Sequence, residues 1–312
     1  MSVDKLTISA SDLGRRRTTG KIKQIAEPYL YLSPSIILIC LVIFTPLVIG
    51  ISYAFQSMHL FNPGDVEWIG FEHFEKIYSD RKFFIALKNT FWWTFGSVLL
   101  QFSLGLGLAL LLKQGFHGRK VFQALIFLPW AVPTFLSALI WAWLFNPVIG
   151  PLPHWFVSLG MLDEPYNILA DPDFALFGPI IANVWFGISF FAITLLASLQ
   201  SIPDEMYEAA AIDGASKWQI FSKITLPFLA PMIVITVMLR TVWIANFADL
   251  IYVMTGGGAA NSTQILSTYI FTTAFKKLDF GYASAVSVVL LVLLLLFATL
   301  LLKMRQKFVR VN

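Results

Sequence analysis

The sequence is poor in the residues from which catalytic and metal sites are built. Its single cysteine, Cys40, lies in an apolar stretch, so the chain can form neither an internal disulfide nor a cysteine-based metal site. The four histidines are scattered without the spacing of metal ligands. No Gly-x4-Gly-Lys-Ser/Thr phosphate loop occurs, and the glycine run at 256–258 is not followed by lysine. We therefore predict no catalytic residue, no metal and no cofactor bound by this chain, and no ATP hydrolysis of its own.

Charged residues are scarce as well, at 13% of 312 residues, whereas 57% are hydrophobic and the mean hydropathy is +0.74. These values are typical of membrane proteins. A helix needs about 20 mostly apolar residues to cross a hydrocarbon core about 30 Å thick. The stretches that meet this need are 29–55, 89–112, 121–145, 175–199, 228–254 and 282–302. Since a spanning segment must satisfy its own backbone hydrogen bonds, we predict an all-α integral membrane protein with six transmembrane helices.

Basic residues are divided unevenly between the two sides of these spans. With six spans both termini share one side, which holds 15 of the 22 lysines and arginines against six on the other, with Arg240 inside a span. The positive-inside rule then places both termini in the cytoplasm. We expect a cytoplasmic tail at 1–28, a transmembrane domain at 29–302 and a second cytoplasmic tail at 303–312. The net charge of +4 follows from this topology and implies contact with membrane lipid, not with nucleic acid.

A polar, helix-prone insert lies between the fourth and fifth apolar stretches, at 201–227. Ser201 favours a helix start as an N-cap, and Gly214 favours the left-handed geometry that ends a helix. Ser216 and Gln219 fit a capping box that starts a second helix. The insert is therefore predicted to form a helix, a sharp turn and a second helix on the cytoplasmic side.

This insert must meet water or a soluble partner, because a charged segment cannot pack against lipid. Met206, Tyr207 and Ile212 are the larger apolar side chains of its first helix. We expect them to anchor that helix in a groove on the partner. Pro227 is expected to stop the second helix or to redirect it into the fifth span.

Several short motifs outside the insert point to a known family. They are LPWAVP at 128–133, WAWLFN at 141–146, SLQSIP at 198–203 and NFADLIYVMTGGG at 246–258. Together with the insert, in which Glu208-Ala209-Ala210 precedes Gly214 by three residues, they resemble the permease subunits of bacterial binding-protein-dependent ABC importers. The resemblance is to the carbohydrate-uptake branch, of the maltose/glycerol-phosphate type. It implies the ABC type I importer permease fold and a multi-pass location in the bacterial cytoplasmic (inner) membrane.

The resemblance also implies partners and a function. The partners would be a second homologous permease subunit, two ATP-binding cassette subunits that use ATP and Mg, and a periplasmic solute-binding protein. The chain would form half of the translocation path for a sugar or sugar derivative. The residues through which the insert would couple to the ATPase subunits are Glu208, Ala209, Ala210, Asp213, Gly214, Ile224, Leu226 and Pro227.

Four residues in the fifth stretch are candidates for the solute path: Arg240, Trp243, Asn246 and Asp249. Arg240 lies about 12 residues into the span, near the middle of the membrane at about 1.5 Å per residue. An arginine there costs roughly 2.5–3.5 kcal/mol on insertion scales, so it must face protein or water. It lines the solute path or it forms an inter-helix hydrogen bond or salt bridge, and the sequence leaves both open. Arg240 and Asp249 fall on opposite faces of an ideal helix and are not expected to pair.

Two other classes stay open on the sequence. An ion-coupled secondary transporter or channel for small polar solutes would also have six spans and buried polar groups, but it has no use for a docking insert. A membrane-embedded enzyme would need a nucleophile, a metal cluster or a paired acid and base at membrane depth. The sequence offers no such set.

Overall fold

The computed structural model describes residues 28–29, 31–61, 64 and 66–309, with side chains as far as residue 303. The predicted cytoplasmic tail at 1–28 therefore lies almost wholly outside the described residues. Within the described residues the ordered elements are helices, and strand-like pairing is limited to the two isolated bridges Gln56–Trp68 and His59–Asp279. The chain divides into two compact units, residues 1–53 and residues 54–312.

The first unit contains one apolar helix, Tyr31–Tyr53, none of whose described residues is buried. It includes a wide π-helical turn, η1 (Cys40–Phe44), followed by α2 (Thr45–Tyr53). The turn ends two residues before Pro46, which has no backbone N–H and whose ring would clash with the carbonyl four residues earlier in a regular helix. Widening the helix by one residue relieves that clash without breaking the span.

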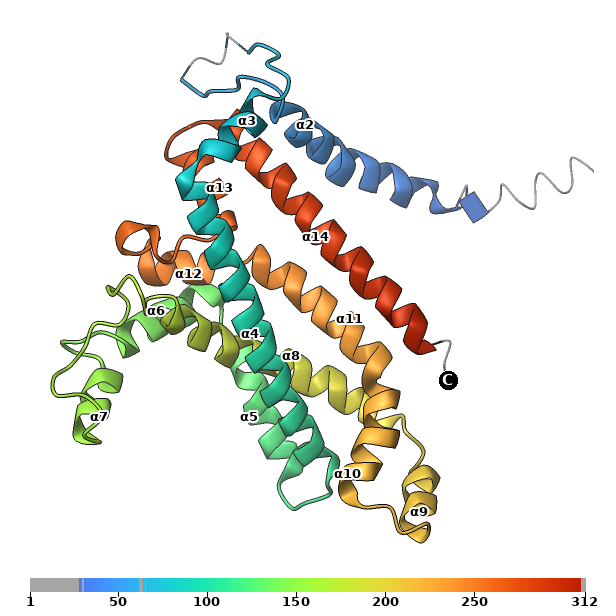
Figure 1. The fold of residues 1–312 in the computed structure, drawn as a ribbon. Coiled ribbons are helices and arrows are strands. Elements are labelled where there is room, and N and C mark those ends of the chain that lie inside the picture. The colour runs from blue at the N-terminus through green and yellow to red at the C-terminus, as the bar shows by residue number, and fades with distance from the viewer. Residues whose placement is uncertain (1–27, 30, 62–63, 65, 310–312) are drawn as a thin grey trace, which may run out of the picture. The chain divides into compact units, whose positions relative to one another are not determined.

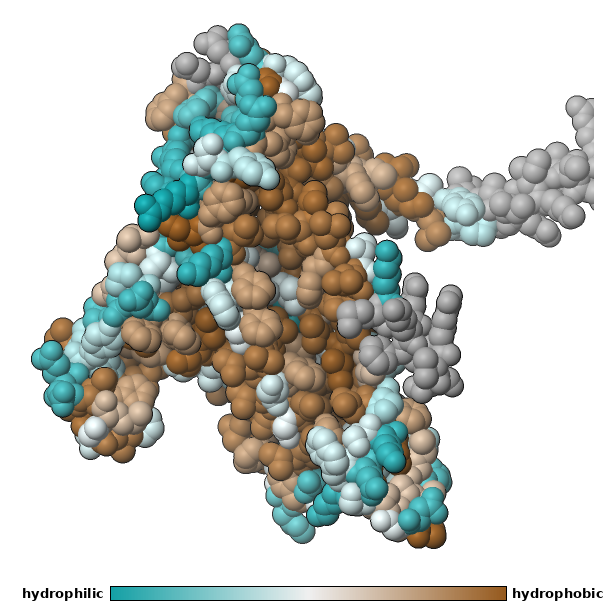
Figure 2. Space-filling view, in the orientation of Figure 1, coloured by the Kyte–Doolittle hydropathy of each residue, from teal (hydrophilic) through white to brown (hydrophobic). Residues whose placement is uncertain are grey.

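The second unit holds the remaining helices (Figure 1). They are α3 (Glu72–Ser79), α4 (Arg81–Lys113), α5 (Arg119–Ala131), α6 (Thr134–Leu144), α7 (Pro151–Ser158), α8 (Phe177–Gln200), α9 (Asp204–Ile212), α10 (Lys217–Ile220), η2 (Phe221–Thr225), α11 (Leu226–Ala245), α12 (Ala248–Thr255), η3 (Ala259–Asn261), α13 (Leu266–Phe275) and α14 (Phe280–Val309). Hydrophobic residues cover the middle of this unit, and hydrophilic residues gather over α3 and around α9 and α10 (Figure 2).

The prediction of an all-helical membrane protein is confirmed, with two of the six spans altered. Among the described residues five helices are long and apolar enough to cross a membrane, or six if α5 and α6 form one span. The predicted third span, 121–145, is bent by 95° between these two helices. The cause is Pro133, which cannot donate to the helix and which holds Val132 in an extended conformation (φ −81°, ψ 129°).

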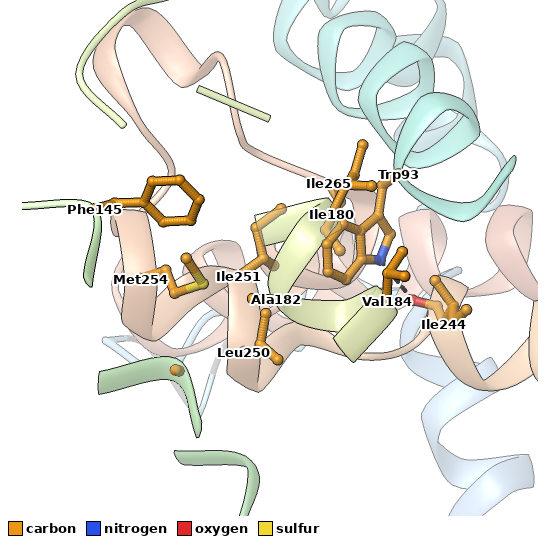
Figure 3. Close-up of a cluster of buried hydrophobic side chains, with 11 residues drawn as sticks. Trp93, Phe145, Ile180, Ala182, Val184, Ile244, Leu250, Ile251, Met254 and Ile265 are labelled. Carbon is orange, nitrogen blue, oxygen red and sulfur yellow. Dashed lines mark hydrogen bonds between the residues drawn. The ribbon is translucent and has the colours of Figure 1, made fainter. Parts of the chain in front are cut away.

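The predicted fifth span, 228–254, is wrong at its C-terminal end. The spanning helix runs from Lys217 to Ala245, and Phe247 (φ −85°, ψ 79°) leaves the helical conformation before α12 begins. The side chain of Trp93, from α4, donates its indole N–H to the carbonyl of Ile244 at 2.9 Å (Figure 3). The same carbonyl also accepts from the amide of Phe247 at 3.1 Å, so the indole adds a second donor at the helix end. Trp93 itself is fully buried in the cluster around Leu250 and Ile251.

Helix α4 is the element on which the others assemble. Its C-terminal half packs closely on α8, where Gly105 lies directly against Phe191 and the neighbouring backbone. Near its N-terminal end, Asn89 donates to three carbonyls of the loop after α12, those of Asn261, Ser262 and Gln264, at 3.0–3.2 Å. Helix α4 thus contacts both the loop after α12 and the helix that leads into the polar insert.

Candidate functional site

The polar insert folds as a helix, a sharp turn and a helix, as predicted. Helix α9 is followed by Gly214 in the left-handed conformation (φ +75°), where a residue with a side chain would be strained. The amide of Ala215 donates to the carbonyl of Ala210 at 2.9 Å, which closes the end of α9. Ser216 and Gln219 form the expected capping box at the start of α10.

One detail of the helix start was predicted wrongly. The residue that precedes α9 is Pro203, without a side-chain cap, and the hydroxyl of Ser201 donates backward to the carbonyl of Ser198 at 2.8 Å. Ser201 therefore ends α8 and does not begin α9. Ser and Thr hydroxyls reach local carbonyls readily, so the sequence alone does not decide between the two helix ends.

Helix α10 does not end at Pro227 but passes into the fifth span. The helix is continuous from Lys217 to Ala245 through the wide turn η2, in which the amide of Leu226 donates to the carbonyl of Phe221. As at Pro46, the wide turn ends two residues before a proline, so the same relief of the proline clash applies. Of the two outcomes expected at Pro227, redirection into the span is the one observed.

One face of the insert is packed against the chain's own spans. Met206, Tyr207 and Ile224 contact a buried cluster formed by the C-terminal parts of α4 and α8 and the start of α11. The hydroxyl of Tyr207 lies 3.3 Å from that of Thr225, and the ammonium of Lys113 lies 3.6 Å above the Tyr207 ring. The expectation that Met206 and Tyr207 anchor a partner is therefore corrected, because their side chains already have partners inside this chain.

The opposite face of the insert is open. Glu208, Ala209, Asp213 and Gly214 are exposed, Ala210 is partly buried, and the side chain of Ile212 is 86% exposed. The side chain of Leu226 is 38% exposed, and Pro227 is half-buried.

Trp218 was not among the predicted site residues, yet it is 72% exposed, and its ring lies tilted by 34° beside that of Phe221, with centroids 5.7 Å apart. A tryptophan two residues after a capping serine, in an otherwise polar turn, was the available signal. Large apolar side chains left open beside polar ones are typical of a surface that binds another protein. Trp218 and Ile212 are the two such side chains here.

Arg240 is buried where α11 meets α4 and α8. It is 4% exposed, and its Nε donates to Oε1 of Gln101 at 2.7 Å. Gln101 in turn donates from Nε2 to the carbonyl of Asn183 at 2.8 Å. Gly187 provides the room, because a Cβ there would lie 2.0 Å from Nη2 of Arg240. In this structure Arg240 therefore forms an inter-helix hydrogen bond within its own chain.

The four predicted path residues do not meet in one place. Trp243 is half-exposed and lies beside Phe190, with ring centroids 5.6 Å apart. Asn246 is exposed, donates to the carbonyl of Val242 at 2.9 Å, and lines a cavity of about 470 Å³ bounded mainly by α13 and α14. Asp249 is exposed in the first turn of α12. Arg240 is thus buried, whereas the other three residues are exposed.

The buried seam around Arg240 has unpaired polar atoms. Among the described residues, the side-chain amide of Asn183, the hydroxyls of Thr94 and Ser97 and Nη2 of Arg240 have no hydrogen-bond partner. Buried polar groups are normally paired, so a seam of this kind fits an element that changes partners. No group of three or more His, Cys, Asp or Glu side chains is arranged to hold a metal in the part of the chain that the structure describes.

Comparisons with known proteins agree with the sequence motifs. A family model described as a binding-protein-dependent transport system inner membrane component matches residues 101–310. The trehalose/maltose transport system permease protein MalF of Thermococcus litoralis is 40% identical over 237 residues, which cover 76% of this chain and 79% of that protein. The sulfoquinovosyl glycerol transport system permease protein SmoG of Agrobacterium fabrum is 36% identical over 264 residues, 85% of each chain.

The fold is shared with a solved structure. A chain of a bacterial alginate ABC transporter, crystallised in complex with alginate pentasaccharide-bound periplasmic protein, matches with a TM-score of 0.79 and 25% identity. The match covers 92% of this chain and 96% of that chain. The predicted importer permease fold and the resemblance in the sequence are both confirmed.

Proposed function

Because the chain belongs to the family of binding-protein-dependent transport system inner membrane components, we propose that it forms half of the translocation path of an ATP-driven importer for a sugar or sugar derivative. A second, homologous permease subunit completes the path, and a periplasmic binding protein delivers the solute. Two ATP-binding cassette subunits hydrolyse ATP, with Mg, on the cytoplasmic side. Both termini lie on that same side, in accordance with the positive-inside rule.

The observation that carries this proposal is the two-sided insert at α9 and α10. Its outer side leaves Ile212 and Trp218 open, whereas its inner side is packed on α4, α8 and α11 through Met206, Tyr207 and Ile224. An element that is free on one side and attached to three spans on the other can pass a displacement from a docked partner to those spans.

The mechanism that follows is mechanical. ATP binding closes the partner subunits, the docked insert moves with them, and the spans turn from an inward-open to an outward-open state. The solute-loaded binding protein must favour the same state as ATP, since coupling between two sites is reciprocal. The unpaired polar atoms around Arg240 supply alternative hydrogen-bond partners for such a rearrangement of α11 against α4 and α8.

The cargo class rests on the relatives. MalF is named for trehalose and maltose, SmoG for sulfoquinovosyl glycerol, and the matched structure for alginate. These are sugars or sugar derivatives, both neutral and acidic. A half-exposed Trp243 and the cavity beside Asn246 offer an aromatic face and an amide, which suit a polyhydroxylated solute.

The docking surface is tested by charge insertion. Ile212→Asp and Trp218→Asp are expected to abolish co-purification of the ATPase subunits, because each would bury a carboxylate in the interface. Tyr78→Asp is the matched control, since Tyr78 is 84% exposed on α3, outside the insert. Normal yields of ATPase subunits with normal uptake in both insert variants would contradict the docking proposal.

A second variant separates docking from force transfer. Tyr207→Ala leaves the open face intact but removes the ring that contacts Lys113 and Thr225. We expect the complex to assemble and to hydrolyse ATP, while uptake per ATP hydrolysed falls. Uptake into proteoliposomes that persists without ATP would instead favour an ion-coupled secondary transporter or channel.

A further inference from the structure

A second polar site lies at the end of α4 farthest from the insert. Helix α4 ends at Lys113, beside Tyr207, and begins after Asp80, 33 residues or about 50 Å away. Around Asp80 residues at the ends of the helices α3, α4, α13 and α14 line an open cavity of about 410 Å³. If the insert is cytoplasmic, this cavity faces the periplasm.

The carboxylates at the floor of the cavity, those of Asp80 and Asp279, already accept hydrogen bonds from this chain. Asp80 accepts hydrogen bonds from the hydroxyls of Tyr269 and Tyr282, and its other oxygen accepts from the amide of Lys82 at 2.9 Å. Asp279 accepts from the amide of Tyr282 at 2.9 Å. The carboxylates therefore act as caps at the starts of α4 and α14, and both tyrosines are buried beneath them.

The rim carries three lysines. Lys76, Lys82 and Lys277 line the cavity, and all three are exposed. Lys76 lies over the ring of Tyr282 at 4.8 Å and Lys277 over that of Tyr269 at 4.9 Å, so aromatic faces hold these stems in place. Among the described side chains none of the three makes an ion pair with a carboxylate. Burial, with repulsion from Lys82 and Lys76, lowers the pKa of Lys277.

We propose that this cavity receives a carboxylate, supplied by an acidic side chain on the surface of the periplasmic binding protein. The inference rests on the proposed function and adds a specific contact to it. At about 30 Å³ per water, the cavity has room for roughly a dozen waters, and so for the end of an Asp or Glu side chain. The anion sits among the three ammonium groups at the rim, because Asp80 on the floor repels it from greater depth.

A protein carboxylate fits better than a lipid phosphate. The surface over α3 is hydrophilic (Figure 2), so water and not acyl chains surrounds this side of the cavity. It also fits better than an enclosed free solute: the tyrosine hydroxyls already donate to Asp80, so the donors left for an anion are exposed side chains of the cavity, Ser79 and the three lysines. Charge complementarity of this kind sets the orientation and rate of docking.

The test uses the whole importer in nanodiscs of phosphatidylcholine, and the readout is the concentration of binding protein that half-maximally stimulates ATP hydrolysis. The triple variant K76Q, K82Q and K277Q is expected to raise this concentration about tenfold, while saturating binding protein still gives the normal maximal rate. The matched control removes three equally exposed charges outside the cavity, as R81Q, K88Q and K276Q, and is expected to change it little.

A charge swap identifies the partner group. Lys277→Glu is expected to weaken stimulation, and an Asp or Glu→Lys change on the binding protein is expected to restore it. Equal effects of the two triple variants, or no restoring substitution among the binding protein's surface acids, would overturn the inference. An effect seen only after phosphatidylglycerol is added would assign the site to a lipid phosphate instead. Failure of the wild-type complex to respond to any binding protein would refute the proposed function itself.

Discussion

The contact between α4 and α8 gives a prediction whose size can be worked from the structure. A Cβ added to Gly105 would lie 2.5 Å from Cβ of Phe191, 3.1 Å from the amide nitrogen of Ala192 and 3.2 Å from the carbonyl oxygen of Ile188. Nonbonded carbons prefer about 3.5–4.0 Å, so the two helices must separate locally by about 1 Å. Overpacking of this kind costs about 1–3 kcal/mol, and the backbone atoms involved cannot rotate away.

Gly107 is the matched control on the same helix. A Cβ there would meet nothing within 4 Å. Both changes to alanine gain the same helix propensity, up to about 1 kcal/mol, so the difference between the two variants isolates the overpacking. We expect Gly105→Ala to unfold at a temperature several degrees below Gly107→Ala when the purified complex is heated in detergent. Gly96→Ala, whose Cβ would make an ordinary 3.5 Å contact with Ile180, should resemble Gly107→Ala.

The refuting result is a Gly105→Ala protein as stable as Gly107→Ala, with the same uptake. It would mean that α4 and α8 do not approach as closely in the membrane as they do here. The hydrogen bonds from Arg240 to Gln101 and from Gln101 to Asn183, which require the same approach of α4 and α8, would then be in error as well.

Three further predictions follow from single side chains. Asn89→Ala should weaken the loop after α12 by about 2 kcal/mol, because two amide hydrogens that serve three loop carbonyls are lost; faster hydrogen exchange at 256–265 measured by mass spectrometry would show it. Gln101→Leu should destabilise the protein by removing the acceptor for Arg240, and adding Arg240→Met should recover part of that loss, so a thermal double-mutant cycle should be non-additive. Burial would raise the pKa of Asp80, but hydrogen bonds from Tyr269, Tyr282 and backbone amides lower it overall; the stability difference between wild type and Asp80→Asn should therefore be constant above about pH 4 and shrink as the pH falls below it.

Much of this fold could be predicted because its determinants are local. Apolar length alone gave the spanning helices, and Gly214 with the Ser216 capping box gave the turn of the insert. In both cases the residues that decide the structure are neighbours in the sequence. The bend at Pro133 has a local cause too. It was not part of the prediction because the apolar stretch at 121–145 is long enough for one straight span.

The remaining features depend on contacts between distant residues. The fifth span ends at Ala245 although the apolar sequence continues, and the bond that completes this end comes from Trp93 on another helix. The cavity around Asp80 joins residues up to about 200 positions apart, from Lys76 to Tyr282. The two alternatives left open for Arg240 could be separated only by finding Gln101 beside it.

The proposed transfer of force through the insert depends on where its helices can bend. The path from Trp218 to Arg240 lies within one helix and covers 22 residue steps, about 33 Å. It contains the wide turn η2 and two prolines, Pro227 and Pro231, each of which removes a backbone hydrogen bond. A load on α10 alone would be absorbed by bending there. Helix α9 has no such weak point, and its Tyr207 contacts both the end of α4 and the η2 segment. In the mechanism we propose, a displacement of the docked insert therefore reaches the spans mainly through the face of α9 that carries Tyr207, which contacts both α4 and η2.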